Sequence, residues 1–329
     1  MATTTTPVPD ASPISGSRTF LSRLTDGDEI ARAITFVFAA SVVLITVLLV
    51  LSLWQGSVLA RHKFGFSFFV TQVWDPNAGI FGALPFIYGT LVTAIVSLLI
   101  AVPLGIGAAI FLAELAPARV SDTLEFFIDL LAAVPSVIYG VLGIFLIVPL
   151  MRSYIEPALK KTLGFLPLFQ GPAYGIGFLT AGIVLAVMII PYIISVSREV
   201  LLSVPRDQRE AALSLGSTRW ESTWKVVVPF ARTGIMGSIF LALARALGET
   251  MAVTMVIGNT PKISASLLAS GYSIAAAIAN EFNEASSPLH SQALIELGLV
   301  LFLLTFILNG LARLLILATS QRGSGMGNA

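Results

Sequence analysis

The sequence contains no cysteine and only two histidines, His62 and His290. Without thiols it can form neither a disulfide framework nor a thiolate metal site. The two histidines lie far apart in the chain with no second ligand nearby, so we interpret them as loop histidines and expect no metal and no cofactor bound by this chain. The net charge is only +1 at pH 7, which gives no sign of a nucleic-acid partner.

Charged residues are also scarce. They make up 11% of the 329 residues, whereas a soluble domain of this length usually carries about a quarter. Hydrophobic residues make up 56% of the chain and fall in long uncharged blocks, too many for one globular core. Because a membrane-spanning helix needs about 20 mostly apolar residues, the sequence predicts an all-α, polytopic membrane protein surrounded by lipid.

A phosphate-binding loop for ATP is missing as well. No lysine follows a glycine anywhere in the sequence, so the chain has no Gly-Lys-Ser/Thr loop to hold ATP phosphates. If transport across the membrane is driven by ATP, then ATP and Mg must bind to a separate polypeptide, and this chain is not itself an enzyme.

Six apolar segments are long enough to span a membrane. They cover residues 33–54, 85–112, 128–151, 175–196, 233–258 and 293–317. We therefore predict a membrane domain over 33–317, a tail over 1–32 that is disordered at its start, and a second tail over 318–329. The N-terminal residues are rich in Thr, Ser and Pro and lack the basic start of a signal peptide.

The placement of Lys and Arg predicts the orientation. Twelve of these residues fall in the two tails and in the second and fourth loops, and six in the other three loops. Both termini are therefore expected on the cytoplasmic side. On the opposite side, residues 263–282 are rich in Ala, Ser and Ile, which fits either a short or re-entrant helix at the outer mouth or a lipid-facing surface helix.

The cytoplasmic loop at about 203–229 has strong helix signals. Pro205 suits a first helical turn, and Asp207 is favourable near the positive N-terminal end of a helix. Gly216 supplies the left-handed residue that ends it. The loop is therefore predicted to contain a short, sharply ended helix beneath the membrane.

The residues of this helix predict a small apolar face. Ala211, Ala212 and Leu215 are expected to lie together beside Arg209 and Glu210. Such a face can dock into a groove on a partner, but an interfacial helix that only caps the bundle has the same composition.

A second short helix is predicted to follow. Thr218 and Glu221 have the spacing of a capping box. The helix is expected to end before Pro229, because proline has no N–H to continue it.

Two charges interrupt the fifth span. Uncharged runs of twelve residues flank Arg245 and Glu249, so the two are expected near mid-membrane, where each charge costs about 2.5–3.5 kcal/mol. At i,i+4 they share one helix face and can partly neutralise each other. The planar guanidinium suits an oxyanion such as phosphate, and the carboxylate can accept a hydrogen bond from a protonated phosphate oxygen. The alternative is a structural ion pair that fixes helix packing.

A second acidic pair, Glu125 and Asp129, lies at the start of the third predicted span. We interpret it as a solvated helix end.

The cytoplasmic loop resembles the EAA loop of ABC importer permeases. That pattern is Glu-Ala-Ala, three residues, Gly, nine residues, then Ile-x-Leu-Pro, and here Val226 and Val228 replace the Ile and Leu. In that family the loop forms a coupling helix that seats in a cleft of the ATPase subunit. The resemblance implies a coupling loop that includes Arg209, Glu210, Ala211, Ala212, Gly216 and Pro229.

Three further stretches, 103–114, 132–140 and 245–253, resemble the phosphate-specific permeases, with a Met-Ala-Val ending closer to the C-type (PstC) subunit than to the A-type. The resemblance covers roughly residues 30–320 and implies a six-helix type I importer permease of the bacterial inner membrane. It assigns Arg245 and Glu249 to phosphate transport, in the pathway or at a gate. The implied partners are an A-type permease subunit, an ATPase dimer and an extracytoplasmic phosphate-binding protein.

Three alternatives stay open: a permease for another small solute, a secondary transporter or channel, and a membrane scaffold. A secondary transporter would need its own coupling-ion site and usually repeated halves. No clear repeat relates the first three spans to the last three.

Overall fold

The computed structural model describes residues 28–324, so most of the predicted tail 1–32 and the last five residues of the tail 318–329 lie outside the described residues. The described part is helical, with a single isolated β-bridge between Asp75 and Ile80. Six of its helical stretches are long and apolar enough to cross a membrane. They are Ala31–Gly56, Leu84–Leu115, Ser136–Leu163, Phe178–Leu202, Arg219–Leu247 and Pro288–Leu314. The predicted all-α fold with six spans is confirmed.

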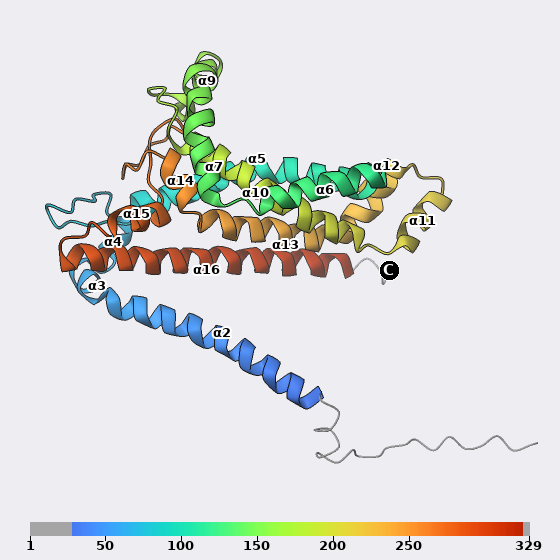
Figure 1. The fold of residues 1–329 in the computed structure, drawn as a ribbon, viewed down its shortest axis with the longest axis horizontal. Coiled ribbons are helices and arrows are strands. Elements are labelled where there is room, and N and C mark those ends of the chain that lie inside the picture. The colour runs from blue at the N-terminus through green and yellow to red at the C-terminus, as the bar shows by residue number, and fades with distance from the viewer. Residues whose placement is uncertain (1–27, 325–329) are drawn as a thin grey trace, which may run out of the picture. The chain divides into compact units, whose positions relative to one another are not determined.

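Most helices follow one another closely, and three longer segments, 71–83, 164–177 and 257–273, connect the others (Figure 1). In chain order they are α2 (Asp28–Gly56), α3 (Val58–Phe64), α4 (Ser67–Val70), α5 (Leu84–Ile110), α6 (Ala118–Ala132), α7 (Ser136–Leu142), α8 (Val148–Leu150), α9 (Glu156–Leu163), α10 (Phe178–Leu202), α11 (Arg206–Ser214), α12 (Arg219–Ser222), α13 (Val228–Leu247), α14 (Met251–Val256), α15 (Ile274–Glu281) and α16 (Pro288–Ser324). Wider π-turns η1 (Phe111–Leu115), η2 (Gly143–Ile147), η3 (Met151–Ile155) and η5 (Thr223–Val227) continue the helices that precede them, and η4 (Pro167–Phe169) is a 3-10 turn.

The chain divides into two compact units, residues 1–52 and 53–329. The described part of the first unit is α2 up to Ser52. Its apolar residues from Ile34 to Leu51 are largely exposed, as expected for a helix whose solvent is lipid.

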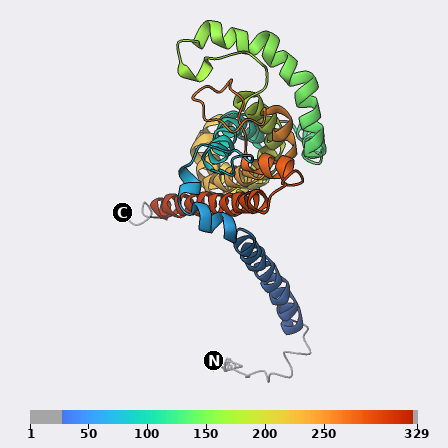
Figure 2. The ribbon, with the colours of Figure 1, turned by 90° about the vertical axis from the view of Figure 1, so that its left-hand side faces the viewer.

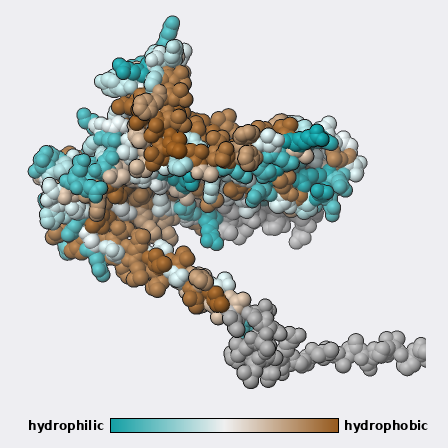
Figure 3. All heavy atoms as spheres, viewed as in Figure 1, coloured by the Kyte–Doolittle hydropathy of each residue, from teal (hydrophilic) through white to brown (hydrophobic). Residues whose placement is uncertain are grey.

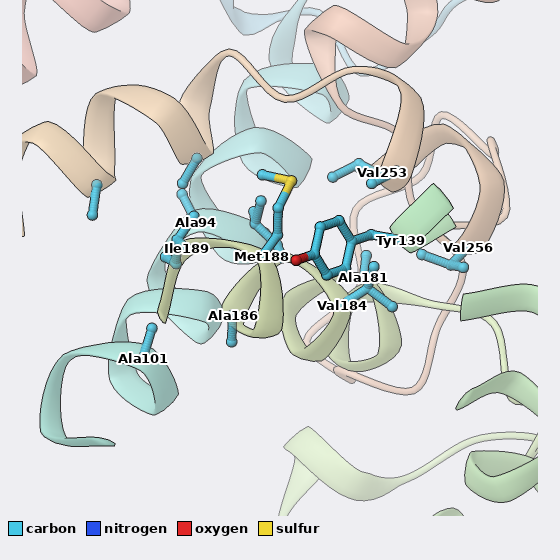
Figure 4. Close-up of a cluster of buried hydrophobic side chains, with 14 of the residues drawn as sticks. Ala94, Ala101, Tyr139, Ala181, Val184, Ala186, Met188, Ile189, Val253 and Val256 are labelled. Atoms are coloured by element: carbon cyan, nitrogen blue, oxygen red, sulfur yellow. The ribbon is translucent and has the colours of Figure 1, made fainter. Parts of the chain in front are cut away.

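The core of the second unit forms where α5 and α10 pack along each other, with α13, α14 and α7 completing the cluster. Small residues allow this close packing: a Cβ added at Gly182 would meet Val96, and one at Gly105 would meet Ile193. Figure 4 shows Tyr139 directed into this cluster beside Met188.

The predicted third span, 128–151, begins in the wrong place. α6 ends at Ala132, and a new helix starts at Ser136 and runs to Leu163. The bend lies at Val134, because a residue before proline is disfavoured in the helical conformation. The first part of this helix, α7, packs against α14 and α10. The part after α7 arcs away from the other helices of its unit (Figure 2) and carries many exposed apolar side chains (Figure 3).

The predicted fifth span, 233–258, is wrong at both ends. One continuous helix runs from Arg219 to Leu247 and stops at Gly248, and α14 is a separate element. The helix predicted to end before Pro229 continues through it. In the π-turn η5 the N–H of Val228 donates to the carbonyl of Thr223, five residues back. The wider turn lets the helix continue through Pro229, although proline has no N–H to donate.

The predicted outer helix at 263–282 exists only over Ile274–Glu281. The segment before it is not helical, and it folds against the start of α10: Phe178 N–H donates to the carbonyl of Ala269 (3.1 Å) and Leu179 N–H to that of Leu267 (2.8 Å). The first four residues of α15 are buried, so the lipid-facing alternative is wrong.

Candidate functional site

The loop between α10 and α12 folds much as its sequence predicts. α11 begins at Arg206, with Pro205 in the capping position just before it and Asp207 in the first turn. Gly216 has φ +85°, the left-handed conformation expected of it. The capping box of Thr218 and Glu221 is formed from both sides. This loop and α11 lie at one end of the second unit, while α15 lies at the other end (Figure 1).

The residues of the predicted apolar face of α11 do not lie together: one is buried and the others are exposed. Ala212 is buried and is the only buried residue of the helix. Ala211, Glu210 and Leu215 are exposed, and Leu215, directly after the helix, is 90% exposed. The outward surface of α11 therefore presents an uncovered leucine beside an alanine and a carboxylate. This surface is available for contact with a partner.

Arg209 does not belong to this outward surface. Its guanidinium turns inward and forms an ion pair with Glu114, which closes the helix that begins with α5 (Nη2 to Oε1, 2.8 Å). It also donates to the carbonyls of Leu201 and Val204, at the end of α10. One feature of the sequence pointed to Glu114: it directly follows an uncharged stretch from 76 to 113.

A second arginine ties α6 to α10. Arg198 is buried, pairs with Glu125 and donates to the hydroxyl of Ser121. Nearby, Ser195 donates to Asp129 (2.9 Å). The interpretation as a solvated helix end is therefore wrong for Glu125, which pairs with a buried arginine. Asp129 is exposed in the last turn of α6, and its bond to Ser195 also joins α6 to α10. Sequence reasoning missed this pairing because the partners are more than 60 residues apart.

Arg245 and Glu249 lie on either side of a helix break. Arg245 is in the last turn of α13, whereas Glu249 follows the stop at Gly248. The prediction that they share one helix face is wrong, because no helix connects them. Within residues 28–324 no ion pair joins them either, so a structural ion pair does not explain their presence.

Each charge has a different neighbour. The guanidinium of Arg245 lies over the ring of Tyr192 on α10, 5.6 Å from its centroid, and its side chain is exposed. Glu249 is half-buried, and its Oε1 accepts a hydrogen bond from the N–H of Ala252 in the first turn of α14 (3.2 Å). A carboxylate is favourable at that end of a helix. Arg245 thus keeps its donors available for a further partner, while Glu249 stabilises the broken helix.

The histidines do not form a site with each other. Neither histidine is in a loop as predicted. His62 is exposed in α3, whereas His290 is buried in α16 and its Nε2 lies 3.1 Å from Oε2 of Glu281. Among the described residues, no group of three His, Asp or Glu side chains is arranged to hold a metal ion.

Comparison with known proteins identifies the family. A family described as "Binding-protein-dependent transport system inner membrane component" matches residues 101–320. The chain is 46% identical over 290 residues to the "Phosphate transport system permease protein PstC" of Mesorhizobium japonicum, covering 86% of this chain and 89% of that protein. It is 49% identical over 276 residues to the protein of the same name from Xylella fastidiosa, covering 83% of this chain and 85% of that protein.

A solved structure has the same fold. A chain from "Inward facing conformations of the MetNI methionine ABC transporter" matches with a TM-score of 0.53 and 17% identity, covering 75% of this chain and 99% of that one. At this identity the match shows the fold alone, and the predicted type of permease fold is confirmed. This multi-pass protein therefore belongs to the family of binding-protein-dependent transport system inner membrane components, among the PstC permeases.

Proposed function

We propose that this chain is the permease subunit of an ATP-driven importer that carries inorganic phosphate across the inner membrane. The observation that carries the proposal is the identity of 46–49% with PstC permeases over more than four-fifths of the chain. The exposed guanidinium of Arg245 supports it, because a planar fork of donors suits a phosphate oxyanion.

The proposed partners follow from the two ends of the second unit. The exposed surface of α11, with Leu215, Ala211 and Glu210, would seat on a separate ATPase, which binds ATP and Mg. The α15 end would receive phosphate from an extracytoplasmic binding protein, and a homologous A-type permease subunit would complete the pathway. In this arrangement α11 and both termini are cytoplasmic, as the distribution of Lys and Arg predicts.

The proposed mechanism is alternating access. Closure of the ATPase dimer on ATP would move α11 and switch the pathway between inward-facing and outward-facing states, as in other transporters that alternate around one site. Arg245 would bind or gate phosphate in the pathway, and Glu249 would hold the start of α14 beside it.

The test is reconstitution of the chain with its permease partner, the ATPase and the binding protein in liposomes. We expect ATP-dependent uptake of phosphate that excess sulfate does not inhibit. Glu210→Ala and Gly216→Val are expected to weaken co-purification of the ATPase, whereas Asp122→Ala, at an exposed position on α6, should not. Intact association in both loop variants would contradict the coupling role of α11.

The role of Arg245 is tested separately. Arg245→Lys keeps the charge and removes the planar fork, so phosphate uptake is expected to fall by about tenfold or more. Arg119→Lys, an exposed arginine on α6, is the matched control and should transport normally. Undiminished uptake by Arg245→Lys would count against direct recognition of phosphate by this residue.

A further inference from the structure

Few side chains attach α11 to the rest of its unit. Of its nine residues, only Ala212 is buried. The other strong connection is the side chain of Arg209, which is 20% exposed and points away from the outward surface of the helix. Apart from its backbone connections and its packing against η5 and α12, α11 is therefore attached to the unit chiefly by one buried alanine and one guanidinium.

Arg209 uses all three of its guanidinium nitrogens on the rest of the unit. Its Nε donates to both oxygens of Glu114 (3.2 and 3.3 Å), and its Nη2 donates to Oε1 of Glu114 (2.8 Å) and to the carbonyl of Leu201 (2.7 Å). Its Nη1 donates to the carbonyl of Val204 (2.5 Å). Charge-assisted bonds of this bidentate kind are short and fix geometry.

Two of the acceptors, Glu114 and Leu201, belong to different membrane spans, and Val204 lies shortly after the second of these spans. Glu114, whose side chain is 10% exposed, ends the helix that begins at Leu84, and Leu201 lies in the last turn of α10. These two helices form the packed centre of the unit, and α10 carries Tyr192 beneath Arg245. One side chain thus joins the exposed helix to both central spans.

We propose that Arg209 and Glu114 form a strut that transmits the displacement of α11 to the two central spans. The pair couples ATP hydrolysis to translocation and does not itself bind the ATPase. This inference rests on the proposed function. A role for Arg209 in binding the ATPase is disfavoured by the geometry, because its nitrogens are already engaged within the chain.

The experiment measures the ratio of phosphate transported to ATP hydrolysed in liposomes that contain the complete transporter. Arg209→Lys keeps the charge but loses the fork, and Glu114→Gln removes the paired charge with little change in shape. Each is expected to lower the ratio by about tenfold while the ATPase still co-purifies. Glu199→Gln on α10, an exposed carboxylate with no hydrogen-bonded partner among the described side chains, is the matched control and should keep the ratio.

A double variant tests whether the two residues act as one unit. Arg209→Ala combined with Glu114→Ala should be no worse than Arg209→Ala alone, because the second change removes a partner already lost. If the alanine variants fail to assemble, Arg209→Lys and Glu114→Gln decide the matter.

Two results would overturn the strut: a wild-type ratio in Arg209→Lys and Glu114→Gln, or loss of ATPase association in both. Failure of the proposed function is distinguishable, since the wild-type transporter would then show no ATP-dependent phosphate uptake.

Discussion

Arg245 is an exposed arginine in a chain whose exposed surface is mostly apolar. Left in lipid, its charge would cost several kcal/mol, so we infer that it faces the transport pathway or the partner permease. The ring of Tyr192 below it offers an attractive aromatic face. That contact holds the guanidinium while leaving its donors available.

The contact between Arg245 and Tyr192 leads to a prediction about transport. Tyr192→Leu removes the aromatic face, and because a cation–π contact contributes about 0.5–2 kcal/mol, we expect the maximal phosphate uptake rate to fall by about 2- to 30-fold. Tyr192→Phe keeps the face and should transport within about twofold of wild type. Tyr154→Leu, at an exposed tyrosine elsewhere, is the control. Equal losses in the Phe and Leu variants would assign the effect to the hydroxyl group.

For single residues, the charges could be located from the sequence, but their partners could not. The importance of Arg245 was predictable because long uncharged runs flank it. The partner of Arg209 was not, since Glu114 is 95 residues away and the contact depends on how two spans pack. Ala212 and Leu215 were expected on one face, but the helix ends between them, and Leu215 points outward.

The helix α5 approaches the backbone of the segment before α15 closely at Gly89. A Cβ built on Gly89 would lie 2.1 Å from the carbonyl oxygen of Tyr272. Ile274 N–H donates to the hydroxyl of Thr90 at the same place (3.0 Å). This segment is therefore fixed to α5 by backbone contact that only glycine permits.

A stability prediction follows for two glycines in this one helix. Gly89→Ala should destabilise the protein by about 1–3 kcal/mol through overpacking against backbone. A Cβ added at Gly107 would meet nothing within 4 Å. Gly107→Ala should therefore leave the stability of the protein unchanged or raise it by up to about 1 kcal/mol, because alanine favours the helix. Thermal unfolding in detergent, followed by tryptophan fluorescence, measures both. Similar midpoints for the two variants would refute the close approach.

The number of spans was predictable from the sequence, but their ends were not. Length and hydropathy locate a segment in lipid without indicating where the helix breaks within it. A helix ends shortly before Pro135, whereas the helix that contains Pro229 continues through a π-turn. The sequence around the two prolines does not distinguish these outcomes. The break at Gly248 separates two charges that i,i+4 spacing placed on one face. Breaks of this kind depend on tertiary packing, which local propensity does not encode.

The two ends of the second unit differ in chemistry. The α11 end carries Arg198 and Arg209, each in an ion pair with a glutamate, and the exposed surface around Leu215. The α15 end is closed by a buried segment in which Glu281 accepts from Trp74 (2.8 Å) beside His290. The exposed helix at one end and the packed closing segment at the other therefore offer different surfaces to a partner.

The orientation of the whole molecule in the membrane can be tested by labelling single introduced cysteines, because the chain has no cysteine of its own. Ser214→Cys, exposed at the end of α11, should react with a membrane-impermeant maleimide only after the cells are opened. Asn77→Cys, exposed at the turn after Asp75, should react in spheroplasts that are still intact. The wild-type chain is the blank, because it has no thiol to label. The reverse pattern would invert the molecule and place α11 out of reach of a cytoplasmic ATPase. Because the twelve-to-six distribution of Lys and Arg favours a cytoplasmic α11 end, we expect the first pattern.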